Sequence, residues 1–405
     1  MNNRIPKLRF KEFSSNWRIT KLENISSIIM GQSPLGNTYT NFENKYILVQ
    51  GNSDLLNGYV KPRIWTSQLT KMAKKGDIIM SVRAPAGEVG RTNYDCVIGR
   101  GVAAIKGNNF IYYNLFKLNS ENYWKRISCG STFESLNSDN IKSLELIIPE
   151  KIEQEKIGKF FLVLDNIITL YKKKCEKLEI IRKSLIENVF IDLGFNQPNI
   201  RFKEFNSKWI NKTFSELYKK NTVKNSNLKY DENNVISVAN MYFKSDVKIS
   251  NEEYLKTYNI FKIGDIAFEG NKSKNFTCGR FVENTIGDGI ISHVFEVFSP
   301  IIEYDLWFWK YLINNEKIMK NILMKSTKAT TMMSNLVSKD FLEQKIKLPE
   351  LKEQTKIGIL LNTISYNITL CKREYCSTLN HKIHKLRIKK LKNLIVLSFY
   401  FVFFL

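Results

Sequence analysis

Apolar residues recur every three or four positions along two long stretches of this chain. The first series is Ile157, Phe161, Leu164, Ile168, Tyr171, Cys175, Leu178, Arg182, Leu185 and Val189, in which only Arg182 is charged. The second is Ile357, Leu361, Ile364, Ile368, Cys371 and Tyr375, shifting by one residue to Leu379, Ile383 and Leu386. Alternating steps of four and three are typical of a coiled-coil seam. We therefore predict two long helices packed antiparallel, with two ordinary amphipathic helices in separate domains as the alternative.

The blocks that precede and begin these helices occur twice. PKLRFKEFSSNW (Pro6 to Trp17) returns as PNIRFKEFNSKW (Pro198 to Trp209), and LIIPEKIEQEKIGKF (Leu146 to Phe160) returns as IKLPELKEQTKIGIL (Ile346 to Leu360). Pro149 and Pro349 suit the first turn of a helix, where a missing N–H costs nothing. Two matched blocks in the same order indicate a tandem duplication of a unit of about 200 residues.

The stretches between the repeated blocks differ in sequence but share an outline. Gly76-Asp77 opens the strand-like run DIIMSVR, and Gly264-Asp265 opens DIAFEG. Further on, VIGRGVAAI (97–105) and IISHVFEV (290–297) both have the composition of buried strands. We expect an α+β protein with two mixed α/β domains in tandem pseudo-repeat, joined by the two antiparallel helices. The expected boundaries are a first domain at 1–148, a central helix at 149–190, a second domain at 191–348, a distal helix at 349–391 and an apolar tail at 392–405.

Charge and cysteine content narrow the class of protein. The 62 Lys and Arg residues against 39 Asp and Glu give a net charge of +23, which favours a polyanionic partner such as nucleic acid; an AT-rich genome, which enriches lysine, is the alternative explanation. The six cysteines form no CxxC pair, so we expect reduced cytosolic thiols without a disulfide or zinc site. The apolar tail Leu394 to Leu405 is shorter than the ~20 residues that a membrane span needs, and the chain is expected in the cytoplasm without a membrane partner.

A catalytic centre is not expected in this chain. Its three histidines are scattered, and no phosphate-binding GxxxxGKS loop or S-adenosylmethionine loop follows a strand. We expect a polar contact for His293, in a strand whose first-repeat counterpart carries Arg100, and not acid–base catalysis. Glu150 and Glu153 are expected to complement a helix dipole.

The motifs together resemble a known family. GQSPLGNTY (31–39), QGN (50–52), GDIIMSVRAPAGEVG (76–90), GRGVAAI (99–105) and GSTFESLNSDNIKSLELIIPEKIEQEKIG (130–158) resemble a target-recognition domain of type I restriction–modification specificity subunits. The resemblance covers nearly the whole chain, although FEGNKSKN replaces the SVRAP-type segment in the second domain and the apolar tail replaces an amphipathic closing helix.

The resemblance implies a role and partners. The chain would read a bipartite site on double-stranded DNA, one half per domain, with the helix pair setting the gap. Two modification subunits would methylate adenine with S-adenosylmethionine, and two restriction subunits would use ATP and Mg²⁺ for translocation and cleavage. The chain itself would bind no cofactor and no metal. A diverged, self-contained DNA methyltransferase or nuclease is the alternative, and a coiled-coil scaffold without nucleic acid is a third possibility.

Phosphate contacts are expected from Lys and Arg, and base contacts from loop residues with hydrogen-bonding side chains. Arg83 is a candidate for a guanine contact or for a surface salt bridge, the 31–39 loop for contact or for a structural turn around Pro34, and NKSKN for contact or for a solvated loop. The complete set of expected DNA-binding residues is Gln32, Ser33, Tyr39, Asn52, Arg83, Arg100, Ser131, Thr132, Asn271, Lys272, Ser273, Lys274, Asn275, Arg280, Lys325, Ser326 and Thr327.

Overall fold

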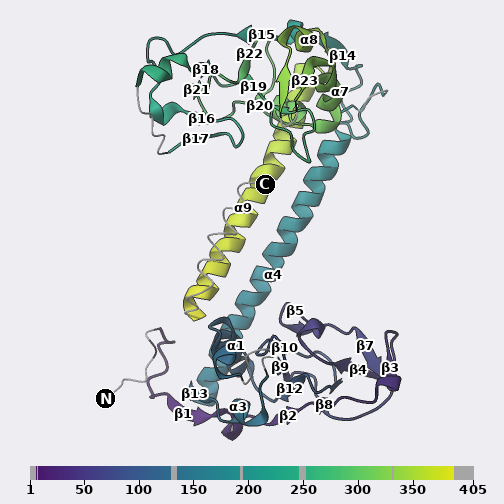
Figure 1. Cartoon of the computed structure of the whole chain (residues 1–405), viewed down its shortest axis with the longest axis vertical. Helices are drawn as coiled ribbons and strands as arrows, with labels where there is room; N and C mark the ends of the chain where they lie inside the picture. Colours follow the sequence, from purple (N-terminus) through teal and green to yellow (C-terminus); the bar gives the residue numbers. More distant parts are fainter. Residues whose placement is uncertain are drawn as a thin grey trace. The chain divides into compact units, whose positions relative to one another are not determined.

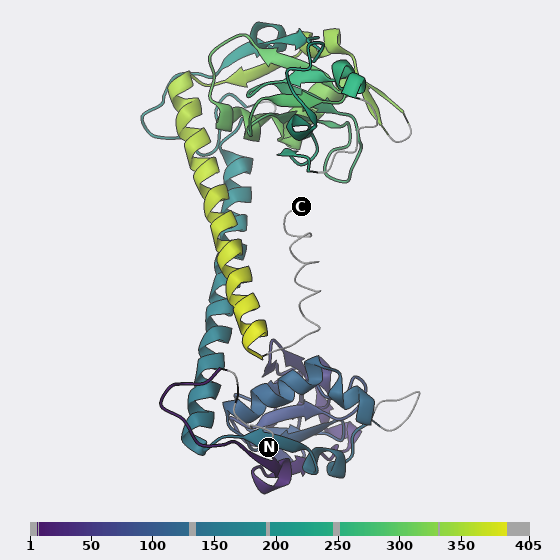
Figure 2. The same cartoon turned by 90° about the vertical axis from the view of Figure 1, so that its left-hand side faces the viewer.

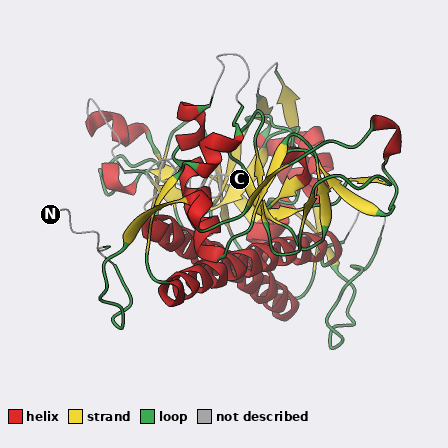
Figure 3. Cartoon of the chain, turned by 90° about the horizontal axis from the view of Figure 1, so that it is seen from below, coloured by secondary structure: helices red, strands yellow, loops and turns green. Residues whose placement is uncertain are grey.

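The computed structural model describes residues 6, 8–128, 135–191, 195–245, 252–330 and 333–386. The contacts divide the chain into two compact units. The first unit contains residues 1–172 and the chain from 374 onward, and the second contains residues 173–373. The chain contains both helices and strands (Figure 3), and the division between the units falls within two long helices, which Figure 1 labels α4 and α9. Each unit is therefore built from one globular part and one portion of each helix.

The two long helices form as the apolar periodicity predicted. They are α4 (Lys151–Asn188) and α9 (Leu351–Leu386), and they lie side by side in Figures 1 and 2. Phe161 shares a hydrophobic cluster with Ile383 in the first unit, whereas Leu185 shares one with Leu361 in the second. The start of α4 thus lies with the end of α9, and the end of α4 with the start of α9. The two helices therefore run antiparallel. The expected fold class, α+β with a coiled-coil pair, is confirmed.

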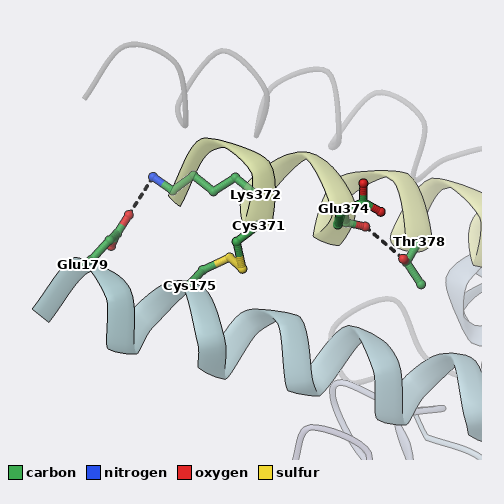
Figure 4. Close-up of a disulfide and its surroundings, with 6 residues drawn as sticks. All are labelled: Cys175, Glu179, Cys371, Lys372, Glu374 and Thr378. Atoms are coloured by element: carbon green, nitrogen blue, oxygen red, sulfur yellow. Dashed lines mark hydrogen bonds and ion pairs between the residues drawn. A yellow bond between two sulfur atoms is a disulfide. The ribbon is translucent and has the colours of Figure 1, made fainter. Parts of the chain in front are cut away.

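The cysteines of the seam correct one expectation. Cys175 and Cys371 were expected as reduced thiols, but they form a disulfide within the second unit, with Cα atoms 5.8 Å apart (Figure 4). Both residues occupy seam positions, and the antiparallel register brings those positions together. Glu179 of α4 and Lys372 of α9 add an ion pair at 2.6 Å next to the cross-link.

Two sheets pack in the first unit, together with a short strand pair. β1 (Arg18–Lys21) pairs with β13 (Glu145–Ile148). The larger sheet has the order β2 (Ile28–Met30), β12 (Val102–Ile105), β9 (Ile78–Ser81), β10 (Val89–Arg91), β6 (Tyr59–Val60) and β5 (Leu55–Leu56). The other sheet has the order β3 (Tyr39–Thr40), β7 (Ile64–Thr66), β4 (Tyr46–Val49), β11 (Cys96–Ile98) and β8 (Met72–Ala73). The helices of this globular part are α1 (Asn109–Ser120), α2 (Tyr123–Ile127) and α3 (Ser138–Lys142).

The second unit repeats the central part of this arrangement. β14 (Ile210–Thr213) pairs with β25 (Lys345–Leu348), and the main sheet has the order β15 (Tyr218–Asn221), β22 (Glu296–Pro300), β19 (Ile266–Glu269) and β20 (Arg280–Glu283). This matches β2-β12-β9-β10 strand for strand. Three further strand pairs are β16 (Ile236–Ser237) with β17 (Tyr242–Phe243), β18 (Asn259–Phe261) with β21 (Gly289–Ile291), and β23 (Thr327–Ala329) with β24 (Ser334–Leu336). The helices of this globular part are α5 (Phe214–Leu217), α6 (Leu306–Ile313), α7 (Glu316–Ser326) and α8 (Ser338–Glu343).

The strands expected after each Gly-Asp pair are confirmed as β9 and β19. The pair ends a turn in which Asp77 N donates to Lys74 O and Asp265 N to Lys262 O, and the turn needs a glycine because Gly76 and Gly264 have φ of +96° and +87°. The runs 97–105 and 290–297 each contain two strands, β11 with β12 and β21 with β22, which belong to different sheets. A short turn therefore separates two strands in each run.

The repeated sequence blocks pack against one another in each unit. Arg9 donates to both carboxylate oxygens of Glu153 at 2.8 and 2.7 Å, and Arg201 donates to those of Glu353 at 2.8 and 2.8 Å. Both glutamates are fully buried. We call this contact between the RFKEF segment and the start of the long helix the anchor. The anchor gives Glu153 a specific partner, in addition to its expected position at a helix start.

A repeated glutamine continues the anchor towards the globular part. Gln154 donates to the carbonyl of Pro149 at 2.9 Å and accepts from the side chain of Asn108, the N-cap of α1, at 3.0 Å. Gln354 donates in the same way to Pro349 at 3.1 Å. The duplication of these blocks is thus explained by structure, because each copy fixes a globular part to the first turns of a helix.

In the part of the chain that the structure describes, no helix is both long and apolar enough to cross a membrane. The apolar tail 394–405 lies outside the described residues.

Candidate nucleic-acid interface

Four segments of the first unit converge beyond the end of β9, and we call them the first loop cluster: residues 31–33, 50–52, 82–83 and 99–101. Backbone hydrogen bonds connect them: Gln32 N donates to Ile98 O at 2.9 Å, Gly99 N to Val49 O at 2.8 Å, and Val82 N to Gly101 O at 2.9 Å. These segments are the centres of the motifs GQSP, QGN, SVRAP and GRG. The motifs are far apart in sequence, and the fold brings them to one place.

Glycine permits this close approach. A Cβ at Gly101 would lie 2.0 Å from the carbonyl oxygen of Gln50, and one at Gly31 would lie 2.1 Å from that of Gly99. Both distances are too short for any other residue without movement of the backbone. The glycines therefore allow the loops to meet, and of the residues beside them Gln32 and Arg100 are exposed.

Three expected DNA-binding residues of the first loop cluster, Gln32, Arg83 and Arg100, are exposed. Neither guanidinium has an ion-pair or hydrogen-bond partner among the described residues, so both positive charges are available to an external anion. Arg83 forms a β-bridge with Ser135 through its backbone, which fixes its place at the end of β9. The surface salt bridge considered for Arg83 does not form within the described residues.

Other candidates of this unit have structural contacts. The Ser33 hydroxyl accepts from the backbone N of Arg100 at 3.1 Å, and the Tyr39 hydroxyl donates to Pro34 O at 3.0 Å. Asn52 is half-buried at the start of a 3-10 turn (Asn52–Asp54). Ser131 and Thr132 lie outside the described residues. The cluster thus contains two arginines that are free to bind an external anion, and polar side chains whose hydrogen bonds shape the loops.

The second unit builds an equivalent cluster from different residues. We call residues 269–272, 279–280 and 330–334 the second loop cluster, of which 331–332 are not described. Asn271 forms a β-bridge with Met333, and Ser334 N donates to Gly270 O at 2.8 Å. Leu136 N likewise donates to Val82 O at 2.9 Å in the first unit. Asn271 therefore occupies the position of Arg83, although the sequences of the two segments differ.

The charged candidates of this cluster differ in availability. Arg280 donates to Glu269 Oε2 at 2.7 Å and to Ala239 O at 2.6 Å, so its guanidinium is engaged within the fold. Lys272 donates to Thr330 O at 2.6 Å. Lys274 and Lys325 are exposed and have no ion-pair partner among the described residues. Asn271, Ser273 and Asn275 are exposed in the same turn.

Two candidates next to α7 are held by that helix. Ser326 is fully buried, and its hydroxyl donates to Ile322 O at 2.8 Å. A side chain with no exposed surface cannot touch DNA in this conformation, so Ser326 is withdrawn from the candidate set. Thr327 is half-buried and donates to Leu323 O at 2.7 Å. Ser326 is the last residue of α7 and has no exposed surface.

Two acidic residues of the clusters were missed by sequence reasoning. Asp54 is buried, accepts from Gln50 N at 2.7 Å and from Arg63 Nε at 3.0 Å, and so shapes the QGN turn. Glu269 holds Arg280 in the second unit. The signal that could have identified Asp54 is its place three residues after Gly51, where a carboxylate caps the turn. Within the described residues, no group of three or more His, Cys, Asp or Glu side chains could hold a metal ion.

His293 stands in a turn and not, as expected, within a strand. The structure ends β21 at Ile291 and begins β22 at Glu296. Its ring is exposed and contacts Tyr254 edge-on, with ring centroids 6.1 Å apart.

Comparison with known proteins gives several relatives. The chain is 29% identical over 183 residues to the MjaX and 36% identical over 124 residues to the MjaIX type I restriction enzyme specificity subunits of Methanocaldococcus jannaschii. It is 31% identical over 141 residues to the HindI specificity subunit of Haemophilus influenzae. These matches cover 43%, 29% and 31% of this chain and 43%, 28% and 30% of the relatives. The chain thus matches less than half of the length of these curated relatives.

A solved structure has a similar fold over nearly the full length. The type I restriction–modification S subunit from M. genitalium superposes with a TM-score of 0.59 at 16% identity, covering 95% of this chain and 98% of that chain. The family model of the type I restriction modification DNA specificity domain matches residues 14–180 and again residues 206–377. Because the two matches cover most of the sequence, the chain belongs to the family of type I restriction–modification DNA specificity subunits.

Proposed function

We propose that this chain recognises a bipartite site on double-stranded DNA and directs adenine methylation or restriction by partner subunits. The observation that carries the proposal is the pair of loop clusters. Each unit presents exposed polar or cationic side chains at an equivalent place beyond the end of a central strand, and the residues there differ. Equivalent frames with different side chains are suited to reading two different half-sites.

The charge of the chain supports a DNA ligand. With a net charge of +23, several lysines and arginines can neutralise phosphates, and the released counterions make binding depend steeply on salt. In the first loop cluster, Arg83 and Arg100 have the fork geometry that pairs with the O6 and N7 atoms of guanine. We assign base contacts to these two arginines and to Asn271, whose amide suits adenine, and phosphate contacts to Lys274 and Lys325.

The proposal gives the chemistry to other chains. Two modification subunits would supply S-adenosylmethionine-dependent methylation, and two restriction subunits would supply ATP- and Mg²⁺-dependent translocation and cleavage. This chain would supply specificity and bind no cofactor. Because its substrate is cellular DNA, the assembly would work in the cytoplasm.

Reconstitution tests this division of labour. The purified chain is incubated with genomic DNA and labelled S-adenosylmethionine, alone and with a type I modification subunit, and methylated adenines are mapped. We expect methylation at one bipartite sequence only in the mixture. Methyl transfer by this chain alone would favour the alternative of a self-contained methyltransferase, and methylation without sequence preference would remove its role in specificity.

A further inference from the structure

Strand register relates His293 to Arg100. In the first unit, Ile78 of β9 pairs with Ile105 of β12, and in the second, Ile266 of β19 pairs with Phe298 of β22. Ile78 and Ile266 are equivalent because each is the second residue after the turn glycine. Counting back five residues from Ile105 and from Phe298 gives Arg100 and His293. The two residues therefore lie at the same distance along the chain from equivalent positions of the shared sheet.

The turns that carry these residues have the same geometry. Val102 N donates to Gly99 O at 3.1 Å, and Phe295 N donates to Ser292 O at 3.2 Å. Arg100 and His293 both stand second in these four-residue turns, and both are exposed. In the first unit, Val82 N donates to Gly101 O at 2.9 Å, which brings the Arg100 turn beside Arg83. In the second unit the β19–β22 pairing ends at Phe268 and Glu296, three residues from Asn271 and from His293. By this equivalence we infer that the His293 turn adjoins the second loop cluster.

The surroundings of His293 leave its ring nitrogens available. Tyr254, 48% exposed, meets the imidazole edge-on, and this contact orients the ring without using either nitrogen. Among the described residues, neither nitrogen has a hydrogen-bond or ion-pair partner. Imidazole carries one donor and one acceptor when neutral and two donors when protonated. An exposed, oriented imidazole whose nitrogens have no other partner can form a hydrogen bond with the edge of a DNA base.

We propose that His293 determines specificity in the second half-site by donating to a hydrogen-bond acceptor on a base edge in the major groove, as the counterpart of Arg100. This inference rests on the proposed function and deepens it. It gives the second unit a base-contacting residue that lies outside the NKSKN segment (271–275). The two units would then read DNA with different side chains at one shared position.

The test uses the full chain assembled with its modification subunit. Competition binding is measured on the identified site and on duplexes in which each base pair is changed singly, for the wild type and for His293→Ala. We expect His293→Ala to lose about 5- to 150-fold of discrimination at one or two adjacent positions of the second half-site, with the first half-site unchanged. Arg100→Ala should produce the reciprocal pattern. His293→Gln, which keeps a donor, should retain part of the discrimination.

Controls separate the possible failures. Ile263→Ala removes an exposed side chain at the opposite end of β19 and should change neither half-site, and thermal unfolding verifies that each variant is folded. Unchanged discrimination in His293→Ala would overturn the inference, and so would an equal loss on all sequences, which indicates a phosphate contact. If the wild-type assembly itself does not discriminate, the proposed function fails instead.

Discussion

The two units have nearly identical anchors but differ at an equivalent position inside them, where one has a basic and the other an acidic residue. The β9–β10 and β19–β20 registers align Arg91 of the first unit with Glu283 of the second. Arg91 places its guanidinium 3.7 Å from the ring centroid of Tyr112 on α1. Glu283 is 1% exposed and lies near the hydroxyl of Tyr304 and the ammonium of Lys310. Burial raises the pKa of Glu283 well above its usual range.

The contrast separates two kinds of constraint. The anchor joins segments that must meet at the base of a long helix, and the same ion pair performs that task in both units. The interior of each globular part only has to accommodate its own side chains. An arginine stacked on a tyrosine and a buried glutamic acid with a raised pKa are two local solutions at one backbone position. The loop clusters diverge for the same reason, because each is shaped by its own contacts.

The largest effect is expected from the anchor, and it should be equal in the two units. Arg9→Leu and Arg201→Leu each leave a fully buried glutamate without its partner, which costs about 3–5 kcal/mol of stability. Hydrogen exchange followed by mass spectrometry would report the stability of each unit separately. Lys11→Ala and Lys203→Ala, at exposed positions of the same segments, should have little effect. A large loss in one unit only would contradict the equivalence of the anchors.

The disulfide should distinguish the units. Reducing Cys175–Cys371, or replacing Cys175 by serine, releases a loop with a sequence separation of 196 residues, and we expect the second unit to lose about 2–4 kcal/mol. The described part of the first unit contains no cross-link, so its exchange rates should change much less. Cys278→Ser serves as the control because this thiol is outside the disulfide. Equal exchange with and without reductant would show that the cross-link does not stabilise the second unit.

The loop clusters should differ in the half-site that they read. Arg83→Ala and Asn271→Ala occupy equivalent positions, and each should cost about 1–3 kcal/mol at base pairs of a different half-site. Selection of bound sequences from a randomised pool would measure this, with the exposed Lys61→Ala as the control. A uniform loss over all sequences would identify phosphate contacts instead.

The smallest effect concerns the buried glutamic acid, and it depends on pH. Because the folded chain holds the Glu283 proton more tightly than the unfolded chain, stability contributed by this group is lost as pH rises above the ordinary carboxyl pKa. Glu283→Gln removes the titration. We expect a higher Tm than the wild type at pH 8 and little difference at pH 4, whereas the exposed Glu88→Gln should change neither. A lower Tm at pH 8 would mean that Glu283 is ionised in the fold.

The sequence by itself determined the duplication, the two long helices and the strands that follow each Gly-Asp pair. These are local or periodic properties, because a seam such as Ile357, Leu361 and Ile364 can be recognised without knowing its partner. The motifs with glycines also indicated the loops of the first unit correctly, since Gly31 and Gly101 permit backbone contacts that no other residue allows.

Tertiary structure alone decided which polar side chains are available. Arg9 and Glu153 are 144 residues apart in sequence, and only the folded chain joins them. Burial removed Ser326 from the candidates, an ion pair with Glu269 engaged Arg280, and the antiparallel register brought Cys175 to Cys371. The paired strands β9–β12 and β19–β22 give the common reference from which His293 and Arg100 are equally distant. Glu153 and Cys371 are far from Arg9 and Cys175 in the chain, so local sequence does not show that these residues meet.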